Sequence, residues 1–187
     1  MRRKDGRSCA IRRKTRETEI SLTMNLDGSG KSKVKVSDEF LRHMIETLSK
    51  YSGFDITLAA KGDIEHHMIE DVAITLGRGL REAIGEKPIR RVADAIIPMD
   101  EALVMASLDL IDRPYAEVEV PDLMYEHFLR SFAMEARATI HSQVIRGEDA
   151  HHIIEATFKA IGACLREATR PREDLLSTKS KVEWESV

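Results

Sequence analysis

The chain has 187 residues and a formal net charge of −3, which is too small to predict a polyanionic or polycationic partner. It contains no run of about 20 apolar residues, so no transmembrane helix is predicted. Its two cysteines, Cys9 and Cys164, are too few for a disulfide framework and favour reduced thiols in a cytoplasmic protein.

Basic residues crowd the start of the chain, at Arg2, Arg3, Lys4, Arg7, Arg12, Arg13, Lys14 and Arg16. No aromatic residues are interleaved with them, which disfavours a nucleic-acid partner. No apolar segment follows them, which argues against a secretory signal. We expect residues 1–12 to form a basic, solvated tail that leads into an edge strand.

The first half of the chain predicts strands and helices in turn. Residues 17–26 alternate apolar and polar side chains, as a half-buried strand does, and the Asp-Gly-Ser-Gly turn at 27–30 predicts a hairpin with the next strand. Ser37 and Asp38 offer an N-cap for the helix that follows. In chain order we expect strands at 17–26 and 32–36, a helix from 38 to about 51, a strand at 54–60 and a helix at 66–83.

The second half repeats this order after a duplication. Placing His43 on His127 aligns the two halves with a single-residue gap, since His43 precedes His66 by 23 positions and His127 precedes His151 by 24. The elements predicted here are strands at 91–97, 102–111 and 115–120, a helix at 123–137, a strand at 139–145 and a helix at 150–169.

Each half therefore places strands before and between two helices. This order predicts an α+β fold built from an internally duplicated unit, in which each half is a sheet with two helices packed on one face. We expect the first unit at residues 13–88, the second at 89–170, and a polar C-terminal arm at 171–187.

A short metal-ligand pattern opens the last helix of each unit, as His66-His67-x-x-Glu70 and His151-His152-x-x-Glu155. The first histidine and the glutamate are four positions apart, so they share one face of a helix. The second histidine points about 100° away. Two such pairs facing each other predict two metal ions, each taking a His/Glu couple from one pattern and the odd histidine from the other.

Histidine and carboxylate ligands without a thiolate suit manganese, iron or zinc. His43 and His127 occupy equivalent places in the repeat, so two-fold packing would give each ion a fourth ligand. Three histidines and one glutamate would leave coordination positions open for a substrate. The competing interpretation, paired histidines on exposed helix starts with no role, is disfavoured because both pairs carry a glutamate at the same offset.

Other metalloenzyme patterns do not fit. Metalloproteases place a glutamate directly after the first histidine, and neither pair has one. Di-iron bundle proteins use the opposite order, Glu-x-x-His.

The chain resembles the imidazoleglycerol-phosphate dehydratase family from about Arg13 to Lys179. The stretches that carry the resemblance are Arg16–Ile20, Phe40–Met44, His66–Ile74, Pro98–Leu103, Arg113–Tyr115, His151–Ala160 and Ser177–Lys179. The loop before His66 is shorter than the family's, the segment after Pro121 is abbreviated, and Ser180 replaces the usual glycine.

The resemblance implies a hydro-lyase of histidine biosynthesis that uses two manganese(II) ions per active site. It implies that His43, His67, His151 and Glu155 hold one ion and that His66, Glu70, His127 and His152 hold the other. It also implies substrate contacts at Glu17, Arg91, Arg113, Lys159, Ser177, Thr178 and Lys179. The family further implies a homo-oligomer of 24 subunits with metal sites between them.

The implied reaction converts imidazole glycerol phosphate to imidazole acetol phosphate and water through a metal-stabilised imidazolate. We assign proton shuttling to Glu17, with Glu70 and Glu155 as competing candidates. The cationic side chains would hold the substrate phosphate. Two alternatives stay open: a non-catalytic metal-linked oligomeric shell and a metal-dependent hydrolase.

Overall fold

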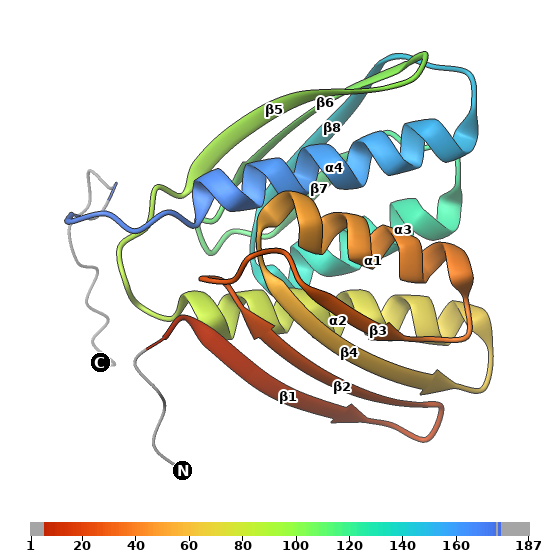
Figure 1. The fold of residues 1–187 in the computed structure, drawn as a ribbon, viewed down its shortest axis with the longest axis horizontal. Helices are drawn as coiled ribbons and strands as arrows, with labels where there is room; N and C mark the ends of the chain where they lie inside the picture. Colours follow the sequence, from red (N-terminus) through yellow and green to blue (C-terminus); the bar gives the residue numbers. More distant parts are fainter. Residues whose placement is uncertain (1–5, 175, 177–187) are drawn as a thin grey trace, which may run out of the picture.

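Two four-stranded sheets enclose four helices in the computed structural model, which describes residues 6–174 and residue 176 (Figure 1). The first sheet has the strand order β1-β2-β4-β3, and the second has the equivalent order β5-β6-β8-β7. Their strands are β1 (Ser8–Lys14), β2 (Thr18–Asn25), β3 (Ser32–Lys35), β4 (Asp55–Gly62), β5 (Val92–Met99), β6 (Ala102–Asp109), β7 (Tyr115–Val118) and β8 (Thr139–Arg146).

The helices lie between the sheets, with α1 (Glu39–Ser52) and α2 (Glu65–Ile84) against the first sheet and α3 (Leu123–Ala136) and α4 (Ala150–Ala168) against the second. Across the middle, α1 packs on α4 and α2 packs on α3. The predicted α+β fold with a duplicated unit is confirmed. None of the described helices is both long and apolar enough to cross a membrane.

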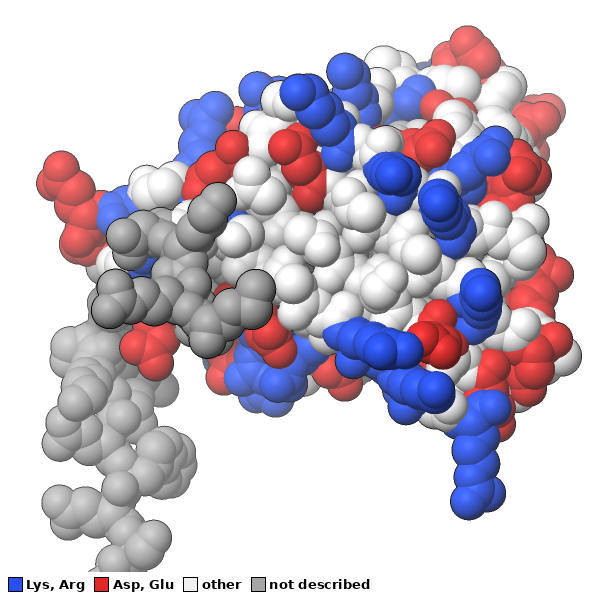
Figure 2. Space-filling model, turned by 60° about the horizontal axis from the view of Figure 1, so that its bottom comes forward, with Lys and Arg blue, Asp and Glu red and all other residues white. Residues whose placement is uncertain are grey.

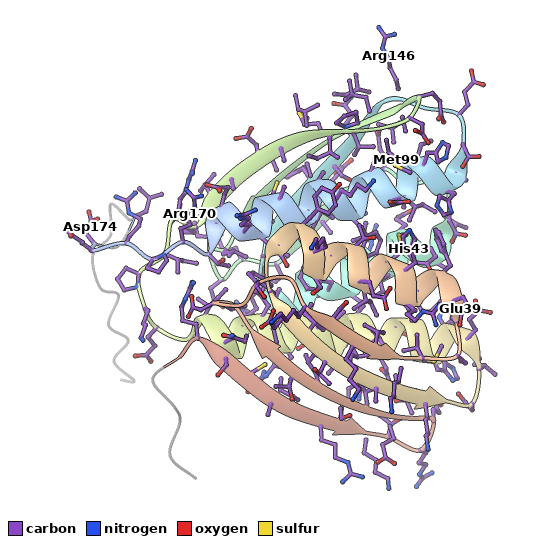
Figure 3. The ribbon with its side chains drawn as sticks, in the orientation of Figure 1. Glu39, His43, Met99, Arg146, Arg170 and Asp174 are labelled. Atoms are coloured by element: carbon purple, nitrogen blue, oxygen red, sulfur yellow. The ribbon has the colours of Figure 1, made fainter. Side chains whose placement is uncertain are left out.

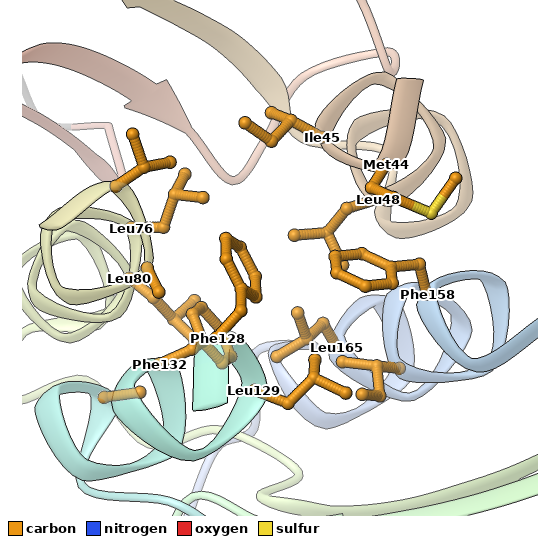
Figure 4. Close-up of a cluster of buried hydrophobic side chains, with 14 of the residues drawn as sticks. Met44, Ile45, Leu48, Leu76, Leu80, Phe128, Leu129, Phe132, Phe158 and Leu165 are labelled. Atoms are coloured by element: carbon orange, nitrogen blue, oxygen red, sulfur yellow. The ribbon is translucent and has the colours of Figure 1, made fainter. Parts of the chain in front are cut away.

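Apolar side chains from all four helices fill the space between the two halves (Figure 4). Phe128 of α3 and Phe158 of α4 are each no more than 1% exposed, and their ring centroids lie 5.4 Å apart. Burying one such side chain stabilises a fold by about 1.5–3 kcal/mol. The core therefore holds the two halves together as one body and fixes the helix pairs that carry the histidines.

Two glycines allow the helix pairs to approach closely. Gly77 of α2 faces the backbone of α3 at Phe132, and Gly162 of α4 faces the backbone of α1 at Leu48. An added Cβ at Gly162 would lie 3.2 Å from the Leu48 oxygen, and one at Gly77 would overlap the Phe132 oxygen. The crossings are equivalent in the repeat, so both helix pairs meet in the same way.

The predicted hairpin between residues 17–26 and 32–36 is wrong. β3 pairs in parallel with β4, and β2 lies between β1 and β4. The turn is held by Asp55 at the start of β4, whose Oδ1 accepts the backbone N–H groups of Ser29 and Lys31 at 2.9 Å each. After this turn the chain crosses β4, so β3 pairs with β4 on the side away from β2.

The expected basic tail through residue 12 is also wrong in its second half, because β1 begins at Ser8 and pairs with β2 along its length. Arg12 and Lys14 point outward from β1, as Lys33 and Lys35 do from β3. Figure 2, which turns the side of the first sheet toward the viewer, shows basic side chains, with acidic ones among them, around an uncharged area. Both edge strands of the first sheet thus carry exposed cations, which oppose edge-to-edge pairing of sheets.

The helix starts differ in a way that matters for the histidines. Asp38 accepts the Leu41 N–H, as the sequence predicts, and Asp149 accepts the His152 N–H at 3.2 Å. α2 has no side-chain cap at Ile64. Its neighbour Asp63 instead accepts the Ile64 N–H at 2.7 Å and contacts His67.

Candidate metal centre

Three side chains from two helices form the first cluster, which comprises His43, His151 and Glu155. His151 and Glu155 lie one turn apart on α4, and His43 reaches them from α1. Both histidine Nε2 atoms lie 3.2 Å from Oε2 of Glu155. The three ligand atoms lie within 4.8 Å of one another, so one metal ion could contact all of them.

The second cluster is its counterpart and comprises His66, Glu70 and His127. His66 and Glu70 lie one turn apart on α2, and His127 reaches them from α3. His127 Nε2 lies 3.2 Å from one Glu70 oxygen, and His66 Nε2 lies 3.9 Å from the other. Each cluster therefore combines a couple from one half of the chain with a histidine from the other half.

The two clusters share one geometry. The rings of His43 and His151 stack with centroids 5.9 Å apart and planes 22° apart, and those of His66 and His127 with 5.6 Å and 23°. The close helix crossings at Gly77 and Gly162 allow this stacking, because they bring α3 and α1 next to the helices that carry the couples. The clusters lie near the N-terminal ends of α2 and α4, and Figure 3 shows His43 at the end remote from Arg170.

The second cluster contains a buried nitrogen that needs a partner. His127 Nε2 is buried and has no hydrogen-bond partner among the described residues, although a Glu70 oxygen lies 3.2 Å away. Buried polar atoms without partners are rare in folded proteins. A cation bound between the three side chains would supply that partner, and two imidazoles with one carboxylate suit a divalent transition metal. The residues present therefore fit a metal ion.

The second histidine of each pair turns away from its cluster, as helix geometry requires. His67 Nδ1 lies 2.9 Å from Asp63 Oδ1, and His152 Nδ1 lies 2.7 Å from Glu101 Oε2. The sequence places both histidines in the metal-ligand set, but within one chain they join neither of the two clusters found among the described residues. Each is instead held by a carboxylate at its Nδ1 atom.

These contacts shift the pKa values of the groups involved. The hydrogen bond to Asp63 raises the pKa of His67, and the hydrogen bond to Glu101 raises that of His152. The Asp149 backbone N–H and His152 together lower the pKa of Glu101 from 4.5 to about 2. Both carboxylates are therefore ionised at neutral pH and orient the rings that they contact.

Lys159 distinguishes the two clusters. Its Nζ lies 2.9 Å from Oε1 of Glu155, and its side chain is only 12% exposed. Burial raises the pKa of Glu155, but the hydrogen bonds from Lys159 and His43 outweigh burial and leave the pKa lowered. The repeat equivalent of Lys159 is Ile74, so only one cluster has a lysine at its glutamate.

Glu17 lies in the turn between β1 and β2, close to the first histidine pair. Its Oε2 is 3.8 Å from His67 Nδ1. The turn is anchored by Thr18, whose hydroxyl donates to the buried carboxylate of Asp71, and Asp71 also pairs with Arg13. The predicted catalytic carboxylate thus lies beside the end of α2 that carries His66 and Glu70 of the second cluster.

Arg91 and Arg113 lie at the opposite end of the fold from the two clusters. The Arg91 N–H bonds to the oxygen of Ala168 at 2.7 Å, at the C-terminus of α4, so it lies about 25 Å from His151 by the helical rise. The Arg113 oxygen accepts a hydrogen bond from Thr139 at the start of β8. Within one chain neither arginine reaches a cluster.

The remaining predicted substrate contacts, Ser177, Thr178 and Lys179, lie outside the described residues. The Arg91 guanidinium donates to the oxygen of Leu176 at 2.6 Å, directly before that segment.

Glu101 and Asp63 are the contacts that the sequence reasoning missed. Glu101 follows Glu17 by 84 positions, the same shift that relates His43 to His127. The repeat alone could therefore have identified Glu101 as a counterpart of the predicted catalytic carboxylate.

Fold and site together define a class: duplicated α+β proteins with two His/His/Glu clusters, each of which could hold a metal ion. Comparison with known proteins gives the family. The family model "Imidazoleglycerol-phosphate dehydratase" matches residues 37–165. The chain belongs to the imidazoleglycerol-phosphate dehydratase family.

Individual relatives agree along nearly the whole chain. An imidazoleglycerol-phosphate dehydratase of Acetivibrio thermocellus is 44% identical and aligns over 94% of this chain and 99% of its own length. The crystal structure of IGPD from Pyrococcus furiosus has a TM-score of 0.84 and 40% identity, covering 92% of this chain and 100% of that one. The Staphylococcus aureus structure gives a TM-score of 0.80 at 30% identity, covering 88% of this chain and 99% of that one.

Proposed function

We propose that this chain dehydrates imidazole glycerol phosphate to imidazole acetol phosphate and water, using two manganese(II) ions per active site. The observation that carries the proposal is the pair of equivalent His/His/Glu clusters in a chain of this family. Three protein ligands per ion leave room for a fourth and for the substrate.

One ion would be held by His43, His151 and Glu155 and the other by His66, Glu70 and His127. His67 and His152 would complete the two sites from neighbouring copies, because both are partly exposed, at 33% and 28%, at the N-terminal ends of α2 and α4 and turn away from their own cluster. In this arrangement the α2 end of one copy meets the α4 end of the next.

Such a contact joins two different surfaces, so it produces a ring or a closed shell rather than a simple dimer. We propose a homo-oligomer on this ground, and the family resemblance suggests 24 subunits. Arg91 and Arg113 are remote from the clusters of their own chain. In the oligomer, the arginines at each site would come from a neighbouring copy. A cytoplasmic location stays a prediction from the sequence.

The reaction removes the hydroxyl on the carbon bonded to the imidazole ring, which leaves as water, and the proton on the next carbon; the enol that results becomes the ketone of imidazole acetol phosphate. Bound cations would polarise the ring and stabilise the charge that develops on it. Glu17, whose Oε2 lies 3.8 Å from His67 Nδ1, would take or deliver a proton. Glu70 and Glu155 are weaker candidates because each would be committed to a metal.

Cationic side chains would hold the phosphate. Lys159 lies next to the first cluster, at Glu155, whereas Arg91, Arg113 and Lys179 would come from elsewhere in the assembly. A guanidinium binds phosphate through two parallel hydrogen bonds and an ammonium binds it as a point charge.

The test is reconstitution. Protein stripped with a chelator should lose dehydration of imidazole glycerol phosphate and regain it with manganese(II), at about two ions per chain. The alternative, a shell protein whose metals only link subunits, predicts saturated sites. Competitive binding of imidazole or triazole at the metals would exclude that alternative, and metal loading without any dehydratase activity would support it.

A further inference from the structure

The two halves treat one pair of equivalent glutamates differently. Glu17 and Glu101 each directly precede the second strand of a β-hairpin, at Thr18 in β2 and Ala102 in β6. Each lies beside the second histidine of the nearer pair, Glu17 beside His67 and Glu101 beside His152. Their positions in the fold are therefore the same, and only their contacts differ.

Glu101 is fully engaged. Its Oε1 accepts the backbone N–H groups of Asp149 at 3.0 Å and Glu148 at 3.4 Å, and its Oε2 lies 2.7 Å from Nδ1 of His152. It thus joins the β5–β6 turn to the loop before α4 and fixes the ring at the same time. The other ring nitrogen, Nε2, lies 3.3 Å from the exposed carboxylate of Asp100.

Glu17 has neither task. In its half the link between turn and loop is made by the backbone, through the Asp63 N–H and the Glu17 oxygen at 3.0 Å. Nδ1 of His67 is bound by Asp63 at 2.9 Å, and Glu17 stays 3.8 Å away. The Glu17 side chain is 55% exposed and has no hydrogen bond from its carboxylate to a described residue.

The second half has a carboxylate in the position of Asp63 but does not use it. Glu148 precedes His152 by four positions, as Asp63 precedes His67. The Glu148 side chain makes no hydrogen bond or ion pair with any residue in the described part of the chain. The carboxylate that contacts the second histidine therefore comes from different positions of the repeat: Asp63 in the first half and Glu101 in the second.

We infer that Glu101 is the positioning residue of His152, that Asp63 is the positioning residue of His67, and that Asp63 thereby leaves the Glu17 carboxylate available for substrate. A carboxylate at Nδ1 fixes the tautomer and the ring orientation, so that Nε2 would be the atom offered to the metal of a neighbouring copy, and it increases the ligand's basicity. The inference rests on the proposed function, since it requires His67 and His152 to be metal ligands.

The experiment is manganese(II) titration of the chelator-stripped full chain, with dehydratase turnover measured in parallel. Four variants are compared with the unchanged chain: Glu101→Gln, Asp63→Asn, Glu17→Gln and, as the matched control, Glu148→Gln. Glu101→Gln and Asp63→Asn should each lower the affinity for one of the two manganese ions by about 10- to 100-fold and leave the affinity for the other unchanged. This is the range seen when a carboxylate partner of a metal ligand is lost.

Glu17→Gln and Glu148→Gln should bind both ions as the unchanged chain does, and only Glu17→Gln of these two should lose turnover. A general effect on folding would lower the affinity for both ions together. Lowered affinity for only one ion therefore indicates that the residue positions a ligand of that ion. Should Glu101→Gln fail to fold, Asp63→Asn makes the same test in the other half.

Unchanged manganese binding in both Glu101→Gln and Asp63→Asn would overturn the inference while the proposed function stands. Weakened binding in Glu17→Gln would overturn the claim that its carboxylate is released. Absence of manganese binding by the unchanged chain would overturn the proposed function, and the inference with it.

Discussion

Gly77 of α2 lies directly against the backbone oxygen of Phe132 in α3, and an added Cβ would overlap that oxygen. Gly77→Ala should therefore destabilise the protein by about 1–3 kcal/mol through overpacking. At an ordinary helical position the same change would stabilise by about 1 kcal/mol. Denaturant unfolding of the metal-free protein decides the sign, and a more stable variant would show that α2 and α3 are not in close contact here.

The equivalent change, Gly162→Ala, should be milder. Its Cβ would lie 2.8 Å from the Tyr51 Cβ and 3.2 Å from the Leu48 oxygen, so α1 must shift, but by less than α3 must at Gly77, where the overlap is with a backbone oxygen. In both variants we expect weaker manganese binding at the cluster that the crossing supports. Metal titration after each unfolding measurement checks this, and unchanged binding in both variants would contradict it.

His67→Ala or His152→Ala should abolish both metal loading at one site and the assembled state, because each histidine would connect neighbouring copies. The measurements are metal content and mass in solution. The exposed His141 provides the matched control, and His141→Ala should retain metal and assembly. A fully assembled, fully loaded His67→Ala protein would remove that residue from the ligand set.

Lys159→Ile should increase the affinity of the first cluster for manganese several-fold, because the ammonium 2.9 Å from Glu155 competes with a cation. Turnover should fall, since Lys159 is a proposed phosphate contact. The reciprocal change, Ile74→Lys, should weaken metal binding at the second cluster. Equal affinities before and after both changes would show that the lysine does not affect metal binding.

Glu101 should make folding stability depend on pH. Its pKa falls from 4.5 to about 2 on folding, so its stabilising contribution is complete above about 4.5 and is lost as the pH drops from there toward 2. In the metal-free protein the unchanged chain should exceed Glu101→Gln in unfolding free energy at pH 6, and the difference should shrink at pH 3. A difference that is the same at both pH values would contradict this assignment.

Both thiols should be unreactive in the folded protein. Burial raises the pKa of Cys9 to about 11 and that of Cys164 to about 12, so at pH 8 roughly one thiol in a thousand or fewer is ionised. Modification with a thiol reagent should be slow until denaturant is added, after which both cysteines should react. Rapid labelling of one thiol in the native state would contradict the burial of that cysteine.

The local parts of the site were predictable from sequence because their geometry is local. A histidine and a glutamate four positions apart must share a helix face, so the couples His66–Glu70 and His151–Glu155 follow directly. The internal repeat then predicted that each ion would gain one of His43 and His127, and the family resemblance implied that each of them joins the opposite couple. Family resemblance supplied the chemistry, which spacing alone does not give.

What failed depends on contacts between distant residues. The hairpin prediction failed because the turn is held by a distant residue: the side chain of Asp55, in β4, accepts the backbone N–H groups of Ser29 and Lys31. The carboxylate that contacts His152 belongs to Glu101, which lies in a turn 51 positions earlier. No local sequence pattern relates the two residues. Strand β1 was missed because its basic side chains suggest a solvated tail, whereas its pairing with β2 decides its structure.

The crossed composition of the clusters has a consequence for how the chain unfolds. A cation bound by His43 and the His151–Glu155 couple closes a loop of more than a hundred residues, much as a covalent bridge would. The second cation, between the His66–Glu70 couple and His127, closes a shorter loop of roughly 60 residues. With both in place neither repeat can open without releasing an ion, so the metal supply would set the lifetime of the folded chain as well as its activity.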